Sequence, residues 1–306
     1  MNVINDIRNI NFSAPTAAAV GIFDGVHIAH RRVISTAAKL AKSMGAKCCV
    51  FTFDTKSVST KGGTPLLTED EKLRRLEESG AQTVVSLDFS LLRDMQPQSF
   101  VNDILLSNNA LGSRAVVCGK DLRFGKNAAG DIQLLETLCA KAGVTVTALE
   151  LIHSGGEVIS TTRIKNLFEN GECEKANSLL GEDICYTLPV THGNEIGRKM
   201  GFPTINQAFP QGLFLPRFGV YCSKVIIGGK QYLGVSNIGV KPTIGRNSPC
   251  IETHIFDFSG DLYGESVTVN LKSFLRTERR FESRGQLFEQ IAEDKRRAQE
   301  YFNSNK

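Results

Sequence analysis

The feature that most limits the fold is a repeated alternation of short β-type runs and helix-type stretches between residues 17 and 151. Ala17–Phe23 (AAAVGIF) and Lys47–Phe53 (KCCVFTF) are short apolar runs typical of buried strands. Arg31–Met44, which lies between them, has the 3.6-residue apolar period of an amphipathic helix. Strand, helix and strand in this order predict one βαβ unit with parallel strands.

Two further cycles of the same kind follow. A helix is expected over residues 68–80, because Thr68 can serve as its N-cap and Glu71 stands three residues later. The remaining expected helices and strands of these cycles are 83–89, 99–109, 114–119, 130–143 and 145–151. The alternation predicts a parallel sheet with helices on both faces.

After Gly181 the pattern changes to short β-type runs separated by Gly, Pro and Asn. These runs are 185–193, 219–239, 252–258 and 266–275. They predict a small antiparallel β-barrel, and residues 283–302 return to helical periodicity. We therefore predict an α/β domain over residues 1–182 and a β-barrel domain with a C-terminal helix over residues 183–306.

Composition adds a few limits. The chain has 306 residues, of which 41% are hydrophobic and 22% charged, as in ordinary soluble globular proteins. Its net charge of +4 is small, so charge gives no reason to expect a nucleic acid or a membrane as partner. No run reaches the ~18 apolar residues that a membrane span requires. The eight cysteines form no C-x-x-C pair, so we expect reduced structural thiols and a cytoplasmic location.

Val20–His30 (VGIFDGVHIAH) lies at the first strand-to-helix turn of the predicted parallel sheet. In such sheets ligands bind beyond the carboxyl ends of the strands, and a helix N-terminus offers free N–H groups to phosphate. His27 and His30 are three residues apart and could point at one anion. We expect nucleotide phosphates here. The alternative is a glycine-rich turn that binds nothing.

These residues resemble the H-x-G-H signature of nucleotidyltransferases, and more fully the G-x-F-D-G-V-H-x-G-H form of bacterial bifunctional riboflavin kinase/FMN adenylyltransferases. Gly119–Asp131 (GKDLRFGKNAAGD) and Ile159–Gly181 (ISTTRIKNLFENGECEKANSLLG) are similar to two further segments of that family. The C-terminal half contains GRKMGFPTIN, GVYCSKV, YLGVSNIGVKPTIG, ETHIFDF and LYGESVTVNLKSFLR, in the order that riboflavin kinases show. The resemblance covers essentially the whole chain.

The resemblance implies a Rossmann-like nucleotidyltransferase domain followed by a riboflavin kinase barrel, and two transferase activities. The C-terminal module would phosphorylate riboflavin to FMN with ATP, and the N-terminal module would adenylylate FMN to FAD with release of pyrophosphate. Mg²⁺ is the implied cofactor, and riboflavin, FMN and ATP are the implied small-molecule partners. We expect no nucleic acid or membrane partner, and a monomer or a weak homo-oligomer.

The resemblance also implies roles for particular residues. Glu252 would be the base for the riboflavin hydroxyl, while His27 and His30 would stabilise the transition state of adenylyl transfer. The residues implied to bind ATP are Gly21, Phe23, Asp24, Gly25, Thr161, Thr162, Arg163, Lys165, Gly197, Arg198, Lys199 and Gly201. The residues implied to bind the flavin are Asp121, Phe124 and Gly125, and those implied to hold Mg²⁺ are Thr204 and Asn206. His254, two residues after Glu252, is expected to pack or to orient a neighbour.

The chain departs from the family pattern at several N-terminal positions. Ala29 replaces a glycine of H-x-G-H, Thr161 replaces a serine, Lys165 replaces an arginine, and residues 53–57 lack the family's proline- and histidine-containing stretch. Two alternatives therefore stay open: a riboflavin kinase whose adenylyltransferase module is slow or inactive, and a non-catalytic flavin- or nucleotide-binding regulator. Taken singly, Glu252 could also be a solvated strand residue, and Pro203 with Asn206 a simple turn.

Overall fold

The computed structural model describes residues 1–60, 63–193, 202–243 and 246–305. Their contacts form two units, Met1–Thr161 (unit 1) and Thr162–Lys306 (unit 2). The two short helices α6 (Thr161–Glu169) and α7 (Cys173–Leu180) fall almost entirely in unit 2. The predicted domain boundary at residues 182/183 stays a prediction.

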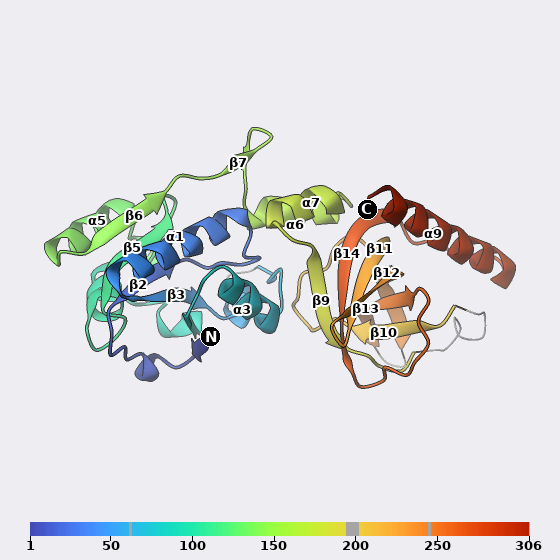
Figure 1. Ribbon diagram of the computed structural model, residues 1–306, viewed down its shortest axis with the longest axis horizontal. Helices are drawn as coiled ribbons and strands as arrows, with labels where there is room; N and C mark the ends of the chain where they lie inside the picture. The colour runs from blue at the N-terminus through green and yellow to red at the C-terminus, as the bar shows by residue number, and fades with distance from the viewer. Residues whose placement is uncertain (61–62, 194–201, 244–245, 306) are drawn as a thin grey trace. The chain divides into compact units, whose positions relative to one another are not determined.

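Unit 1 is built on a six-stranded parallel sheet with the strand order β1-β4-β3-β2-β5-β6 (Figure 1). Its strands are β1 (Asn2–Ile4), β2 (Thr16–Val20), β3 (Lys47–Phe53), β4 (Thr83–Leu87), β5 (Ser113–Gly119) and β6 (Thr145–Leu149). The predicted parallel sheet is confirmed. β1 was not expected, because three residues are too few to show a period. β2 ends at Val20, so Gly21–Phe23 belong to the following loop rather than to the expected strand.

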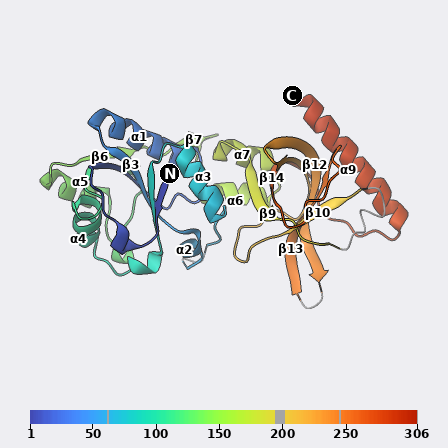
Figure 2. The ribbon, with the colours of Figure 1, turned by 60° about the horizontal axis from the view of Figure 1, so that its bottom comes forward.

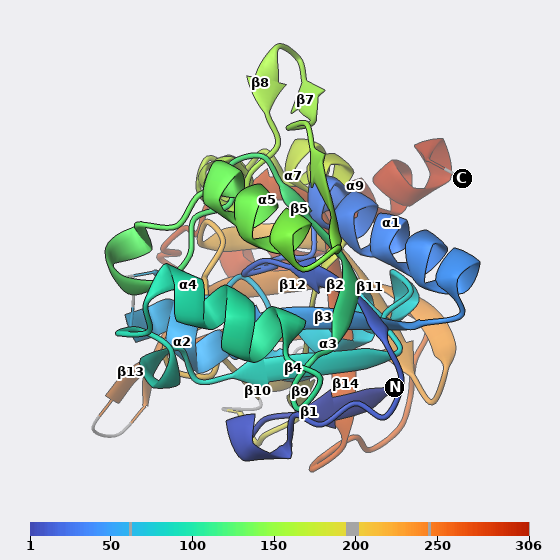
Figure 3. The same cartoon turned by 90° about the vertical axis from the view of Figure 1, so that its left-hand side faces the viewer.

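Helices cover both faces of this sheet. They are α1 (Ile28–Met44), α2 (Thr55–Thr60), α3 (Glu69–Glu78), α4 (Pro97–Ser99), the π-helical segment Phe100–Leu106 and α5 (Ile132–Lys141). Figure 3 shows α1 on one side of the strands and α4 and α5 on the other. On the latter side Val20 and Phe51 pack with Val101, Leu105 and Leu135 in one buried cluster. Alternate strand residues point to the opposite face.

Unit 2 contains a six-stranded antiparallel sheet with the order β10-β13-β12-β11-β14-β9. Its strands are β9 (Ile184–Pro189), β10 (Thr204–Ala208), β11 (Gly219–Ile227), β12 (Lys230–Thr243), β13 (Arg246–Ile255) and β14 (Ser266–Arg276). A bridge between Thr191 and Asn206 joins the two edges of the sheet, and the predicted small antiparallel barrel is confirmed. β11 and β12 are joined by a tight hairpin turn at Gly228 and Gly229, whose φ angles of +55° and +78° suit glycine. Thr204–Asn206 is strand, not the turn of the alternative interpretation.

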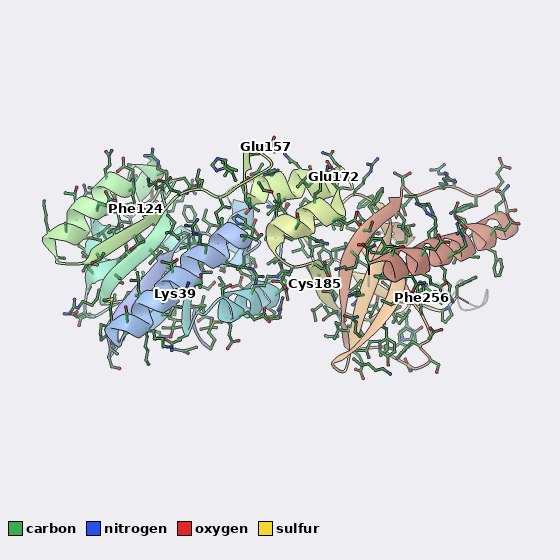
Figure 4. All side chains as sticks on the ribbon, turned by 45° about the horizontal axis from the view of Figure 1, so that its top comes forward. Lys39, Phe124, Glu157, Glu172, Cys185 and Phe256 are labelled. Atoms are coloured by element: carbon green, nitrogen blue, oxygen red, sulfur yellow. The ribbon has the colours of Figure 1, made fainter. Side chains whose placement is uncertain are left out.

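The C-terminal helix α9 (Arg284–Ser304) lies along the outside of these strands and contacts β11, β12 and β14 (Figure 2). Its Ala298 and Phe302 pack against Cys222 and Phe256, and Figure 4 shows Phe256 beside this helix. Among the described residues no helix is both long and apolar enough to cross a membrane.

None of the eight cysteines forms a disulfide, and seven are buried. Burial raises the pKa of the Cys48 thiol and of the Cys139 thiol to about 11. The thiolate form is therefore disfavoured, as suits structural cysteines.

One buried side chain ties α7 to the sheet of unit 2. The Asn177 amide donates from Nδ2 to the Leu271 carbonyl at 2.8 Å, and its Oδ1 accepts from the Ile184 N–H at 2.9 Å. Asn177 is 8% exposed, so neither backbone group could turn to water instead.

We predict that Asn177→Ala lowers the free energy of unfolding of unit 2 by about 1–3 kcal/mol, because two buried backbone groups lose their partners. All five tyrosines lie in residues 186–301 of unit 2 and the chain has no tryptophan, so tyrosine fluorescence during urea denaturation reports this unit. Ser178→Ala, an exposed change on the same helix, is the control and should leave the midpoint in place. Equal midpoints for both variants would contradict the prediction.

Candidate active sites

The loop between β2 and α1 has an unusual backbone. Phe23 and Val26 have φ angles of +51° and +45°, and both side chains are fully buried; Gly25 has φ +83°. Left-handed conformations are costly for side chains that carry a branched or bulky β-carbon. Phe23 folds back over Gly21, where an added Cβ would lie 2.9 Å from the ring. Gly21 is therefore required by the shape of the loop itself.

Four hydrogen bonds hold this loop in place. The backbone oxygens of Ile22 and Val26 accept from Thr52 Oγ1 at 2.7 Å and from Arg31 Nε at 3.0 Å. Asp24 contributes two more: its carboxylate accepts from the Leu66 N–H, and its backbone oxygen accepts from Thr161 Oγ1, each at 2.8 Å. Bonds from several elements thus offset the backbone strain. Asp24 and Thr161, both predicted to bind ATP, fix the loop that would meet it.

His27 and His30 lie together at the start of α1, as the spacing suggested. His27 is the N-cap residue, and its Nδ1 accepts from the His30 N–H at 3.4 Å. The two rings are stacked with centroids 3.5 Å apart, and the Phe23 ring meets His30 edge-on at 5.3 Å. Because Nδ1 of His27 accepts, its proton sits on Nε2, which can donate to a ligand.

Both imidazoles are neutral near pH 7. Burial lowers the pKa of His27 to about 4. Burial, followed by the neighbouring charges of His27 and Lys72, lowers the pKa of His30 well below its usual value. The His30 Nδ1 atom is buried without a hydrogen-bond partner among the described residues. The pair is therefore suited to donate hydrogen bonds to an anion rather than to meet it as cations.

Lys72 on α3 is a site residue that sequence reasoning missed. Its side chain is fully buried, and its ammonium group donates to Thr52 Oγ1 at 3.1 Å and to the Phe53 carbonyl. Burial lowers the pKa of Lys72, while Glu69 and other nearby carboxylates oppose that change. Through Thr52 it supports the loop at Ile22. The sequence contained one indication that Lys72 is buried: it stands four residues before Leu76 and therefore on the same face of the predicted helix.

The predicted flavin segment follows β5, which is the parallel neighbour of β2, so it starts from the same edge of the sheet as the histidine loop. Phe124 is 8% exposed and packs against Phe100 with ring centroids 5.6 Å apart. Gly125 has φ +71°, and a Cβ there would lie 2.7 Å from Pro97. Asp121 is exposed. The segment thus places a fixed aromatic ring beside an accessible carboxylate.

The phosphate-binding residues predicted from the Ile159–Gly181 segment lie at the start of α6. Thr162 is exposed, whereas Arg163 and Lys165 are half-buried. The Lys165 ammonium lies 6.0 Å from the centroid of the Phe214 ring, at the outer limit of a cation–π contact. Gly197, Arg198, Lys199 and Gly201, which are also predicted to bind ATP, lie outside the described residues.

In unit 2 the strand register brings the predicted kinase residues together. Asn206 on β10 stands opposite Glu252 on β13, and Thr204 stands opposite His254. Thr204 and Asn206 are two residues apart and so share one face of β10. Glu252 is also opposite Asn237 on β12, whose Nδ2 donates to Glu278 at 3.1 Å. The sequence did not predict Asn237 and Glu278 as neighbours of Glu252. The segment that contains Asn237 matched the riboflavin kinase pattern, but nothing in the sequence indicated which of its side chains faces Glu252.

A cavity of about 430 Å³ lies beside this row. Thr204 and Asn206 line it, together with Thr253, Phe258 and Tyr263. Tyr263 is stacked on His192 with ring centroids 3.8 Å apart. An added Cβ at Gly193 would lie 2.4 Å from the Asn206 amide, so this glycine makes room for the side chain. Hydroxyl and amide oxygens of this kind suit Mg²⁺ carried by a nucleotide.

The two buried histidines of unit 1 predict acid sensitivity. An unfolded histidine titrates near ~6.5, whereas His27 in the folded chain has a pKa of about 4. The unfolded state therefore takes up protons first, and stability falls as the pH drops through about 6.5 towards about 4.

We expect the free energy of unfolding of unit 1 to fall by at most about 2 kcal/mol per such histidine between pH 7 and pH 5. Calorimetry at several pH values measures this. His27→Asn, which keeps an N-cap acceptor but cannot titrate, should flatten the slope. His153→Asn, at an exposed histidine, should leave it unchanged. Identical slopes in wild type and His27→Asn would refute the assignment.

Comparison with known proteins covers nearly the whole chain. A family model for FAD synthetase matches residues 10–163, and one for riboflavin kinase matches residues 180–302. The bifunctional riboflavin kinase/FMN adenylyltransferase of Bacillus subtilis (strain 168) is 32% identical, over 95% of this chain and 94% of the relative. That of Escherichia coli (strain K12) is 32% identical, over 100% and 99%.

A solved structure shares the fold of the whole chain. The crystal structure of a Streptococcus pneumoniae protein, described as a macrolide-efflux protein, has a TM-score of 0.87 at 26% identity and covers 98% of this chain and 99% of that one. The family models and the curated relatives match both units. The chain therefore belongs to the family of bifunctional riboflavin kinase/FMN adenylyltransferases.

Proposed function

We propose that this protein makes FAD from riboflavin in two steps, each at its own site. It phosphorylates riboflavin to FMN in unit 2 and adenylylates FMN to FAD in unit 1. Membership of the family over both units supports the two activities. The observation that carries the assignment of residues is the register of β10 and β13, which places Asn206 directly opposite Glu252 beside a nucleotide-sized cavity.

In the kinase step Glu252 accepts the proton of the riboflavin 5′-hydroxyl, whose oxygen attacks the γ-phosphorus of ATP. The bond between the β,γ-bridging oxygen and that phosphorus breaks, and ADP leaves. Thr204 and Asn206 would hold Mg²⁺, which neutralises charge on the phosphates when bound. The cavity beside them would take the rest of the nucleotide. Gly197, Arg198, Lys199 and Gly201 remain predicted contacts of the phosphates.

In the adenylyl step a phosphate oxygen of FMN attacks the α-phosphorus of ATP, and pyrophosphate leaves. The neutral His27 and His30 would donate hydrogen bonds to the oxygens that gain charge, and the N-terminus of α1 adds free N–H groups. Gly21, Phe23, Asp24 and Gly25 shape this pocket. The other proposed ligands in unit 1 are Thr161 for phosphate, and Asp121, Phe124 and Gly125 for the flavin. Thr162, Arg163 and Lys165, at the start of unit 2, stay predicted contacts of phosphate.

Partners and location follow from this chemistry. We propose riboflavin, FMN and ATP as the partners, with no nucleic acid or membrane, in a monomer or weak homo-oligomer. ATP as co-substrate and eight cysteines outside any disulfide fit a cytoplasmic location. Ala29, the departure that favoured a slow adenylyltransferase, lies on the first turn of α1 and is half-buried.

The test separates the two sites in one assay. We expect wild-type protein with riboflavin, ATP and Mg²⁺ to yield FAD, and Glu252→Gln to lower the rate of FMN formation by roughly 10²–10⁴-fold, because the general base is lost. This variant should still make FAD from supplied FMN. His27→Asn should stop FAD formation and let FMN accumulate. Chromatography of the flavins measures both products.

The controls and the contrary outcomes are simple. Glu289→Gln, at an exposed carboxylate of α9, should leave both rates unchanged. FMN as the sole product of the wild type would support the kinase-only alternative, and unchanged riboflavin would support the regulator. A folded Glu252→Gln protein that loses both reactions would contradict separate sites.

A further inference from the structure

One buried histidine joins the strand of the proposed base to the strand of the proposed metal ligands. The His254 Nδ1 atom on β13 lies 2.9 Å from the carbonyl oxygen of Pro203. A carbonyl only accepts, so Nδ1 carries the proton and donates. His254 is 8% exposed, and its Nε2 atom is buried without a partner among the described residues. The Pro203 carbonyl therefore receives the ring's one described hydrogen bond.

The surroundings of the ring allow one orientation. Phe202 meets it edge-on with centroids 5.4 Å apart, and Phe256 lies on another side at 5.7 Å. On the strand itself, His254 stands opposite Thr204. An added Cβ at Gly234 would lie 2.7 Å from the His254 carbonyl, so β12 also packs closely here. A side chain confined in this way fixes whatever it bonds to.

Pro203 is the residue through which this bond can act on the site. It directly precedes Thr204, the first residue of β10, and it lines the cavity. The Pro203 carbonyl and the Thr204 N–H belong to one planar peptide group, so fixing the carbonyl fixes the direction in which β10 begins. Proline has no N–H that a neighbouring strand could hold instead.

We propose that His254 is a positioning residue of the kinase site, which through its Nδ1–H bond to the Pro203 carbonyl holds Thr204 in place to receive the metal–nucleotide complex. The proposal rests on the proposed role of Thr204. It assigns His254 no contact with the reacting atoms. It also predicts unequal effects on the two substrates, because the bond acts at Pro203 and Thr204, which meet the nucleotide, whereas Glu252 on β13 is paired with β12 as well as with β10 and meets the riboflavin hydroxyl.

Three replacements at one position test the bond. His254→Phe keeps an aromatic ring but has no donor. His254→Asn places an amide N–H where Nδ1 was, and His254→Gln places one where Nε2 was. Losing the one hydrogen bond that orients the Pro203 carbonyl predicts a roughly ten-fold rise in the KM for MgATP in the Phe and Gln variants. The KM for riboflavin should change by less than about two-fold, and the Asn variant should recover the wild-type KM for MgATP.

FAD formation from supplied FMN serves as the internal control, because unit 1 is untouched by the replacements. That rate should be the same in all three variants, which shows that unit 1 is folded. Tyrosine fluorescence during urea denaturation, which reports unit 2, shows that the barrel of each variant is folded. An Asn variant as impaired as the Phe variant, or an equal rise in the KM for riboflavin, would overturn the proposal.

A spectroscopic measurement tests the hydrogen bond between His254 and Pro203 without an enzyme assay. In wild-type protein labelled with ¹⁵N-histidine, the signals that disappear in His254→Asn should be those of a neutral Nδ1–H tautomer, opposite to that of His27. An Nε2–H tautomer at His254 would overturn the proposal. If Thr204→Ala leaves the KM for MgATP unchanged, the role of Thr204 fails, while this spectrum still decides whether His254 holds Pro203.

Discussion

The kinase site depends on the pairing register between β10 and β13. A slip of one residue would turn Asn206 and Glu252 to opposite faces of the sheet, because strand side chains alternate. A buried polar side chain also fixes β10 against the strands on its other side. Gln207 donates to the carbonyls of Leu188 and Val267 at 2.6 and 2.8 Å, so β10 is tied to the two strands beyond the bridge that joins the edges. A polar group inside a barrel tolerates few other alignments.

Buried polar side chains also fix the alignment of the other strands of the barrel. The hydroxyl groups of Ser223, Ser236 and Thr253 form a buried chain across β11, β12 and β13, with each oxygen pair 2.7 Å apart. A slipped strand would leave these hydroxyls unpaired away from water, at a cost of about 1–3 kcal/mol each. The site residues of unit 1 are positioned in a different way. There a loop of disfavoured backbone angles is held by side chains from neighbouring segments, so strain rather than register sets the positions of His27 and His30.

Periodic elements were predictable from the sequence, and their fine geometry was not. β3 matches the expected Lys47–Phe53, because a seven-residue apolar run between turn residues has few other interpretations. The pairing of His27 with His30, and of Asn206 with Glu252, follows from motifs placed on such elements. The left-handed Phe23 and Val26 could not be foreseen, since their residue types argue against that conformation. Lys72 was missed because a lysine on a helix is ordinarily solvated.

The bonds around the histidine loop have a consequence for how it meets a nucleotide. Ile22, Asp24 and Val26 already have their backbone oxygens occupied by protein donors, and Phe23 already fills the space beneath Gly21. An incoming phosphate would meet N–H groups that are oriented before it arrives. Little chain entropy remains to be lost on association, so most of the attraction between phosphate and helix end is retained as affinity.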